Sequence, residues 1–436
     1  MKFEKPFLFL SALIASFVIA SGVTTVSKPS NYSESYPVVV CPPTLNGLTS
    51  QISISSRKTQ YQRLENRSSK TVPFKALRFP VAKDSLVISA LGTTPLIWQS
   101  RAGSWAGGTL CSGPNSAAWF VGGTANVTSR GRLIIVNSGL SDSIVDVQSY
   151  TENAKQPIKS VNLKSKSYVQ LSLDSLAPGD KSLAVQVTPR SGRVNAFMID
   201  EQGAGLKALG GDFVNSYPSA SKELVIPAIP NQLPKAGQKT SASHTLRILT
   251  PGDVNTTFTL EVLSADGKFI PVGMSSRSIE AGVVSEFTFE PRISASAFAV
   301  RVTSPEPIVA SVSSSVTISG HKDFVWSTAS PSLTPMSIAV TGLSPLIAFA
   351  GESISVKVKA TLVNGKTVSS TIKGSDIATW RVPENARSIT IVSSSKGVFA
   401  GALIASTNGY GFIPIVNGSA LTRVEVPNSN IRVLNP

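Results

Sequence analysis

Histidine and cysteine are scarce in this 436-residue chain, which contains two of each. A tetrahedral zinc site needs four nitrogen or sulfur ligands, and two cysteines with two distant histidines cannot supply them. A Ser-His-Asp triad would depend on His244 or His321, yet no nucleophile-elbow motif surrounds any serine. We interpret both histidines as solvated loop residues, one in a linker and one before a strand. The sequence therefore predicts no catalytic residue, no cofactor and no metal.

Charged residues are also few, at 15% of the chain, whereas hydrophobic residues make up 42%. This composition is too apolar for a disordered protein, and the apolar residues are too evenly spread for a membrane bundle. The chain has 32 glycines and 28 prolines, together with many serines, threonines and valines, which indicates short strands joined by turns. The sequence predicts an all-β protein with a large core.

Long uncharged apolar runs are missing except at the start, where Phe7–Val23 follows Lys2 and Lys5. This order is that of a secretory signal. The run is also nearly long enough to stay in a bilayer, which takes about 17 to 25 apolar residues. We expect residues 1–23 to be either a signal peptide, cleaved before Val23, or an uncleaved membrane anchor. Either way, the remaining chain is predicted to be extracytoplasmic, secreted or anchored to the membrane.

Cys41 and Cys111 are the only cysteines. An even number of cysteines in an exported chain suggests a disulfide, and nothing near either residue would lower a thiol pKa for catalysis. In the chain-entropy model, closing a loop of about 70 residues stabilises the fold by roughly 4 kcal/mol. We predict that these two cysteines are joined.

The apolar segments recur in a fixed order, which reveals an internal repeat. The two clearest copies consist of Leu183–Thr188, Val194–Ile199 and Asp212–Val214, and of Phe298–Thr303, Pro307–Ala310 and Asp323–Val325. Two further copies are indicated by Leu86–Ser89, Pro95–Trp98 and Trp119–Val121, and by Ile389–Val392, Val398–Ile404 and Phe412–Ile413. The two clear copies are predicted to share strand partners and to bury alternate residues of Leu183–Thr188 and Phe298–Thr303.

The repeat divides the exported chain into four β units, at residues 36–125, 130–230, 244–330 and 335–436. Units of this size, with about seven short strands each, are typical of immunoglobulin-like β-sandwiches in tandem. The alternative is a four-bladed propeller-like arrangement, although a propeller blade normally needs only about 40 to 50 residues.

The fourth unit contains the best-signalled hairpin in the chain. Apolar and polar residues alternate from Ile354 to Leu362, and Asn364-Gly365 then turns the chain back. Alternation of this kind predicts a half-buried strand whose polar face includes Lys357 and Lys359.

Several short motifs together resemble those of an uncharacterised family of secreted actinobacterial proteins, domain of unknown function 5719. The motifs are Cys41-Pro42-Pro43, Trp119-Phe120-Val121-Gly122-Gly123, Leu176-Ala177-Pro178-Gly179 and Gly211-Asp212-Phe213-Val214. The resemblance covers most of the exported chain and implies a surface or secreted location and an all-β structure. It implies no activity and no catalytic residues. The chain departs from the pattern where Asp212 and Asp323 stand at the position that Trp119 occupies in the first copy.

Two groups of residues could have either a binding role or a structural role. Trp98, Trp105 and Trp119 could stack on sugar rings, or they could pack against the disulfide in a sandwich core. Asp212 and Asp323 could bind calcium between units, or they could serve at a turn or strand start. A calcium site needs six or more oxygens, and no acidic cluster accompanies these two residues.

We expect a non-enzymatic, exported protein of the cell envelope that acts as a structural or binding scaffold. The alternatives are a carbohydrate-binding surface protein, and a secreted hydrolase or glycan-modifying enzyme with an unrecognised site. An enzyme should have a deep cleft with convergent titratable groups, whereas a scaffold should not.

The charge balance suggests a partner. Lysine and arginine number 40 and aspartate and glutamate 25, for a net charge of +15. An exported protein rarely meets nucleic acid, so we predict no nucleic-acid partner. Anionic wall polymers or a membrane surface would attract such a chain, with Lys357 and Lys359 among the contacts. The alternative is that the charge, spread over all four units, only keeps the chain soluble.

Overall fold

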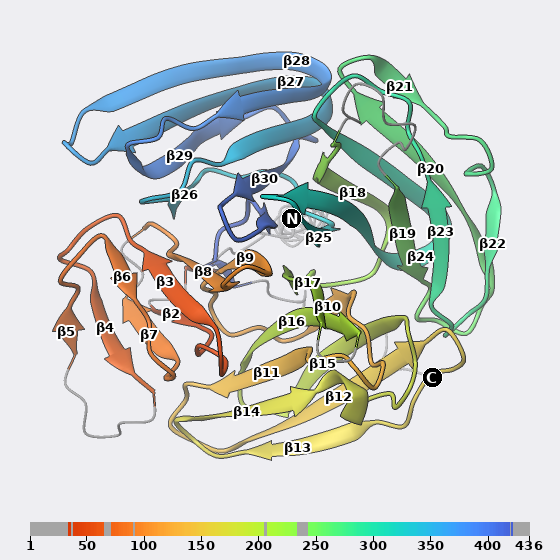
Figure 1. The fold of residues 1–436 in the computed structure, drawn as a ribbon, viewed down its shortest axis with the longest axis horizontal. Helices are drawn as coiled ribbons and strands as arrows, with labels where there is room; N and C mark the ends of the chain where they lie inside the picture. Colours follow the sequence, from red (N-terminus) through yellow and green to blue (C-terminus); the bar gives the residue numbers. More distant parts are fainter. Residues whose placement is uncertain are drawn as a thin grey trace, which may run out of the picture. The chain divides into compact units, whose positions relative to one another are not determined.

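The computed structural model of this protein describes residues 34–35, 38–64, 71–89, 92–204, 207–232, 243–418 and 420–421. Within these ranges the chain forms β-strands and a single turn of 3-10 helix, η1 (Leu173–Ser175). No helix among them is long and apolar enough to cross a membrane. The predicted all-β class is confirmed (Figure 1). The predicted signal peptide or anchor at residues 1–23 lies outside the described residues.

The first group of strands contains two four-stranded antiparallel sheets, ordered β2-β7-β4-β5 and β6-β3-β8-β9. The strands, with the short β1 that precedes them, are β1 (Glu34–Ser35), β2 (Val38–Cys41), β3 (Thr49–Ser53), β4 (Gln60–Arg63), β5 (Val72–Pro73), β6 (Arg78–Pro80), β7 (Leu86–Ser89), β8 (Leu96–Arg101) and β9 (Trp105–Leu110). Their apolar side chains form a core that includes both cysteines.

The second group also contains two four-stranded sheets, ordered β10-β15-β12-β13 and β14-β11-β16-β17. Its strands are β10 (Ala118–Val121), β11 (Arg132–Asn137), β12 (Ser143–Thr151), β13 (Lys159–Leu163), β14 (Ser167–Ser172), β15 (Leu183–Ser191), β16 (Asn195–Ala204) and β17 (Lys207–Val214). All of the recorded strand pairings are antiparallel.

The third group forms one eight-stranded sheet because the 22-residue β24 continues from one layer into the other. The first part of β24 pairs with β18 and β20, and its second part pairs with β19 and β25. The strands are β18 (Ser221–Pro230), β19 (His244–Leu249), β20 (Thr256–Ser264), β21 (Gly267–Phe269), β22 (Arg277–Ile279), β23 (Ser285–Phe289), β24 (Ala297–Ile318) and β25 (His321–Thr328).

The fourth group forms a six-stranded sheet in which β27 plays the same part as β24. One end of β27 pairs with β30 and the other with β29, while β28 follows it along nearly its whole length. The strands are β26 (Met336–Ala339), β27 (Leu346–Leu362), β28 (Thr367–Arg381), β29 (Ala386–Ser394), β30 (Phe399–Ala405) and β31 (Tyr410–Pro414), followed by the short β32 (Ala420–Leu421).

The two clear copies of the repeat have equivalent strand partners, as predicted. β15 pairs with β10 and β12, and the first part of β24 pairs with β18 and β20. β16 pairs with β11 and β17, and the second part of β24 pairs with β19 and β25. The predicted alternation of buried residues is wrong at Leu183, Ala184 and Val185 and at Phe298, Ala299 and Val300, which are all buried. Ala184 is covered because it packs against Leu249 and Val309 of the third group.

The first copy of the repeat closes at a different strand from the one predicted. Trp119–Val121 lies in β10, which pairs with β15 and so belongs to the second group. The strand equivalent to β17, β25 and β31 is β9, because it pairs with β8 as they pair with β16, β24 and β30. The strand that begins a group, such as β10, and the strand that ends one, such as β9, are equally apolar and aromatic. The sequence pattern therefore did not distinguish them. The second group therefore includes β10, which begins at Ala118.

Within the compact unit Ser35–Leu421, the strands β9, β17, β25 and β31 contact one another in a closed ring. Apolar clusters seal each junction: one joins groups one and two, a second groups two and three, a third groups three and four, and a fourth groups four and one. The contact of β31 with β9 closes the ring. The two sheets of the first and second groups, and the single sheets of the third and fourth whose long strands β24 and β27 run through two layers, fit the predicted sandwiches. The mutual arrangement of the four groups fits the propeller-like alternative.

Candidate functional site

The hairpin β27–β28 presents a polar, lysine-bearing face to solvent. On β27, Ile354, Val356 and Val358 are buried in the core of the fourth group, while Lys357 is exposed and Lys359 half-buried. Because successive side chains of a strand point to opposite faces, the predicted alternation places both lysines on the outer face. This part of the sequence analysis is confirmed.

The strand register brings a third lysine to the same face. Lys357 lies opposite Thr371 of β28, and Lys359 lies opposite Ser369. Lys373 follows Thr371 by two residues and therefore lies diagonally across from Lys357, at roughly 7 to 8 Å. Lys373 is exposed, as is Lys366 at the tip of the hairpin.

Hydroxyl side chains fill the rest of this face. Ser393 and Thr390 of β29 lie opposite Lys357 and Lys359. The hydroxyls of Thr390 and Ser337, the latter in β26, are 3.1 Å apart. We call Ser337, Ser355, Lys357, Lys359, Lys366, Ser369, Thr371, Lys373, Thr390 and Ser393 the lysine face. No acidic residue belongs to it, and its lysines take no part in the ion pairs recorded for the described residues. Such a surface offers N–H and O–H donors and positive charge, which suits an anion.

The second polar feature is buried at the ring of inner strands. Asp212 of β17 accepts hydrogen bonds from the backbone N–H of Phe213, at 2.8 Å, and of Trp326 in β25, at 3.0 Å. Asp323 of β25 accepts from the N–H of Phe324, at 2.9 Å, and of Gly211 in β17, at 3.0 Å. Each carboxyl group thus bonds the other strand, although β17 and β25 share no sheet. We call this reciprocal pair the carboxyl clasp.

The clasp also involves β31, and its burial raises the pKa of both acids. Backbone groups of Phe412 and Tyr410 bond Asp212 and Asp323, respectively. Burial raises the pKa of Asp323 to about 7. Burial, with the nearby charge of Asp323, raises the pKa of Asp212 well above its usual value. Asp212 lies inside β17 and Asp323 is the third residue of β25, and both carboxyl groups accept backbone N–H bonds, which favours a structural role over calcium binding.

Residues 90–379, about two thirds of the chain, match the family described as "Family of unknown function (DUF5719)". The chain belongs to the DUF5719 family. This match confirms the resemblance inferred from the short motifs, while the actinobacterial origin expected with it stays a prediction. Membership supplies no activity, since the function of the family is unknown.

One solved structure from Thermotoga maritima, described as "Crystal Structure of Thermotoga maritima 1070", is similar to part of this DUF5719 chain. The identity is 17% and the TM-score 0.21, over 24% of this chain and 94% of that chain. A TM-score this low supports no functional argument. No curated protein matches the chain.

The three tryptophans that were candidates for sugar stacking are buried. Trp98, Trp105 and Trp119 are 5%, 0% and 4% exposed, so a stacking platform built from them is excluded. They do not pack around the disulfide either. Each lies in the cluster of a different junction: Trp98 faces the fourth group, Trp105 the second and Trp119 the third. Their role in this DUF5719 protein is to seal neighbouring groups together.

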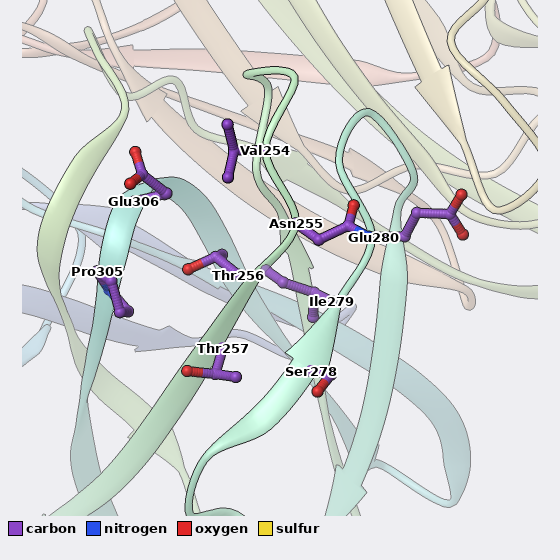
Figure 2. Close-up of a pocket in the computed structure, with 9 residues that line it drawn as sticks. All are labelled: Val254, Asn255, Thr256, Thr257, Ser278, Ile279, Glu280, Pro305 and Glu306. Atoms are coloured by element: carbon purple, nitrogen blue, oxygen red, sulfur yellow. The ribbon is translucent and has the colours of Figure 1, made fainter.

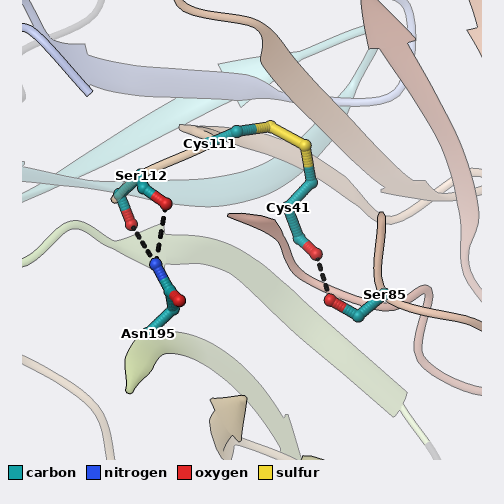
Figure 3. The surroundings of a disulfide bond; sticks show 5 residues. All are labelled: Cys41, Ser85, Cys111, Ser112 and Asn195. Carbon is teal, nitrogen blue, oxygen red and sulfur yellow. Dashed lines mark hydrogen bonds between the residues drawn. A yellow bond between two sulfur atoms is a disulfide. The ribbon is translucent and has the colours of Figure 1, made fainter. Parts of the chain in front are cut away.

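The predicted disulfide is present. Cys41 and Cys111 are bonded, with Cα atoms 4.4 Å apart (Figure 3). The hydroxyl of Ser85 donates a 2.6 Å hydrogen bond to the carbonyl of Cys41. Beside Cys111, the amide of Asn195 donates to the carbonyl of Ser112 at 2.7 Å. Because Asn195 lies in β16, this hydrogen bond links the segment that contains Cys111 and Ser112 to the second group.

The interpretation of His244 as a solvated linker residue is wrong. Its side chain is fully buried in β19, between the rings of Phe289 and Phe298, and its Nδ1 is 2.9 Å from the hydroxyl of Ser314. Burial lowers the pKa of His244 to about 4. The second histidine, His321, begins β25 and hydrogen-bonds the carbonyl of Asn408 at 3.1 Å.

Sequence reasoning missed one buried cation, Arg247 of β19. Its guanidinium donates to the carbonyls of Gly123 and Leu183 in the second group, pairs with Glu286 at 2.7 Å and lies over the ring of Trp326. No local signal in Leu246-Arg247-Ile248 marks this role, since an arginine in a strand is normally solvated. Within the described residues, no group of histidine, cysteine, aspartate and glutamate is arranged to hold a metal ion.

Proposed function

We propose that this protein is a non-enzymatic scaffold of the cell envelope that attaches to anionic wall polymers through the lysine face. The observation that carries the proposal is the gathering of Lys357, Lys359 and Lys373 on one hydroxyl-rich sheet face with no acidic neighbour on it. Export, by a cleaved signal or an anchor at residues 1–23, is part of the proposal.

The geometry of the face favours an extended polyanion over a small ligand. Lys357 and Lys359 are two residues apart, which is about 6 to 7 Å along a strand, so they would meet successive anionic groups of one polymer. Each exposed contact is weak, and several together give useful attachment through multivalency. Hydroxyls between the lysines would donate hydrogen bonds to the same oxygens.

A cell-wall pull-down across a salt series tests the proposal. Binding of the wild-type protein should fall steeply between low and high ionic strength because exposed charge contacts are screened. The triple variant Lys357→Gln, Lys359→Gln, Lys373→Gln should retain about a tenth of the low-salt affinity or less, if each contact contributes roughly 0.5 kcal/mol. The control Lys58→Gln, Lys164→Gln, Lys222→Gln removes the same charge from exposed sites in the other three groups.

Two results would reject the proposal: binding that is absent at low salt or indifferent to salt, and equal losses in the two triple variants. Equal losses would mean that net charge, rather than the lysine face, attracts the polymer. Flotation with vesicles containing anionic lipid distinguishes the membrane surface as the source of negative charge. Stronger retention on vesicles than on purified wall polymer would replace the wall by the membrane as the partner.

A further inference from the structure

The third group contains a groove that opens where β20 changes partners. Residues Thr259–Leu263 of β20 pair with Ala299–Thr303 of β24, whereas Thr256–Phe258 pair with Arg277–Ile279 of β22. The next residues of β24, Ser304–Pro307, belong to none of the recorded strand registers. The two strands therefore separate after Thr303 and leave a space between them.

This space is an open groove of about 700 Å³. The hydroxyls of Thr256 and Ser304, 3.1 Å apart, link its two sides. Its lining consists of Val254, Asn255, Thr256, Thr257, Ser278, Ile279, Glu280, Pro305 and Glu306 (Figure 2). The volume lies in the range of ordinary ligand sites, roughly 300 to 1,000 Å³.

The polar groups of the groove are mostly acceptors. Glu280 and Glu306 stand on opposite sides, and no lysine or arginine lines it. Neither glutamate takes part in the ion pairs recorded for the described residues. Pro305 and Pro307 have no backbone N–H, so the unpaired stretch of β24 offers mainly carbonyl acceptors. In a chain of net charge +15, this groove is an acidic exception.

We propose that the groove binds an extended basic peptide, with its lysine or arginine side chains at Glu280 and Glu306. An extended backbone can donate N–H bonds to a free strand edge, which is the usual mode of peptide addition to a sheet. Val254, Ile279 and Pro305 provide apolar contacts for the aliphatic stems of basic side chains. The groove lining contains no aromatic side chain on which a sugar could stack. The lysine face takes no part in this site, so the two proposals fail independently.

The test uses a fluorescein-labelled heptapeptide in which alanine alternates with lysine and arginine, and a matched peptide with glutamine at the basic positions. Fluorescence anisotropy at low salt should detect binding of the basic peptide to the wild-type protein and none of the glutamine peptide. The double variant Glu280→Gln, Glu306→Gln should weaken binding at least tenfold. The control double variant Asp174→Asn, Glu384→Gln removes two exposed carboxylates elsewhere and should change binding less than twofold.

A second variant tests whether the peptide needs the space of the groove as well as the charge of its glutamates. Thr257→Trp fills the groove and leaves both glutamates, and it should also abolish peptide binding. Ser278→Trp, at an exposed position of β22, serves the same purpose if the first variant does not fold. The proposal is overturned if the basic peptide does not bind, if both double variants lose affinity equally, or if the filled groove binds normally. Self-association that Glu280→Gln, Glu306→Gln abolishes, without peptide binding, would identify a second copy of the chain as the occupant instead.

Discussion

Two buried ionisable residues give this protein opposing pH responses. Asp323 has a pKa raised to about 7 and His244 a pKa lowered to about 4, in both cases mainly because burial disfavours the charged form. Both residues therefore favour the uncharged state at mildly acidic to neutral pH. Asp323 loses a proton and becomes negatively charged as pH rises, whereas His244 gains a proton and becomes positively charged as pH falls.

Asp323 should make the fold less stable as pH rises. Its folded pKa lies above the unfolded value, so its contribution is fully present below about pH 4 and is lost as pH rises through 7. The effect is at most about 4 kcal/mol. Asp323→Asn keeps an acceptor for Gly211 and Phe324 without a charge. Urea denaturation from pH 4 to 8 should show a flatter profile and greater stability at pH 8 than wild type.

Asp376→Asn is the matched control, because Asp376 lies partly exposed on β28 and asparagine tolerates its positive φ of 62°. Its pH profile should follow that of the wild type. A slope that Asp323→Asn leaves unchanged would show that Asp323 is charged in the folded state at all of these pH values.

His244 should act in the opposite direction. The unfolded state takes up a proton near pH 6.5 and the folded state only near pH 4, so stability falls as pH decreases through that window. The loss amounts to roughly 3 kcal/mol. His244→Asn should flatten the profile between pH 4 and 6.5 and cost about 1 to 3 kcal/mol at pH 7, because ring contacts with Phe289 and Phe298 are lost. If His321→Asn, at a partly exposed site, flattened the profile instead, this assignment would be refuted.

At the scale of elements, the inner strands approach closely without forming a common sheet. Asp212 and Asp323 satisfy backbone N–H groups that a neighbouring strand would otherwise bond. Glycines allow the approach: a Cβ atom at Gly107 would lie 2.3 Å from Oδ1 of Asp212. The inner strands thus need two features to pack together. Carboxyl groups accept the backbone N–H bonds between neighbouring strands, and glycines, which have no side chain, stand where the strands are closest.

Gly409, just before β31, offers a direct test of that closeness. A Cβ atom there would lie 2.0 Å from the backbone nitrogen of Ala106 in β9, and a backbone atom cannot move aside cheaply. Gly409→Ala should therefore lower the free energy of unfolding by about 2 to 3 kcal/mol or more. Gly252→Ala, where nothing lies within 4 Å and φ is not positive, should change it by less than about 0.5 kcal/mol. Equal melting temperatures for the two variants would argue against contact between β31 and β9.

At the scale of the whole described unit, arginine side chains cross all four junctions between neighbouring groups, by ion pairs or by hydrogen bonds to carbonyls. Arg101 of the first group pairs with Glu201 of the second at 2.6 Å. Arg247 joins the third group to carbonyls of the second, and Arg301 of the third pairs with Glu352 of the fourth at 3.4 Å. Between the fourth and first groups, Arg78 donates to the carbonyl of Thr341 at 3.0 Å, beside apolar residues that include Trp98 and Leu110.

Charge is distributed unevenly over this unit. The fourth group carries the lysine face, whereas the third carries the acceptor-rich groove with Glu280 and Glu306. The net charge of +15 alone suggested a diffuse attraction to anions. The strand register concentrates part of that charge on one face, and this makes a site-directed test possible.

The sequence by itself determined the features that depend on local pattern. Alternating apolar residues specified the strands, Asn364-Gly365 specified the hairpin turn, and recurrence of the same segments specified equivalent partners for β15 and β24. Two cysteines in a chain expected to be exported were sufficient to predict one disulfide. Family membership was also visible in short motifs.

Only the tertiary structure decided which surfaces meet. It buried His244 and the three tryptophans, assigned Trp119–Val121 to an opening strand, and paired Asp212 with Asp323 across two sheets. Residues far apart in sequence make these contacts, so hydrophobic periodicity carries no information about them. An apolar face requires a cover, but its pattern is the same whether that cover is the second sheet of its own group or the neighbouring group in the ring.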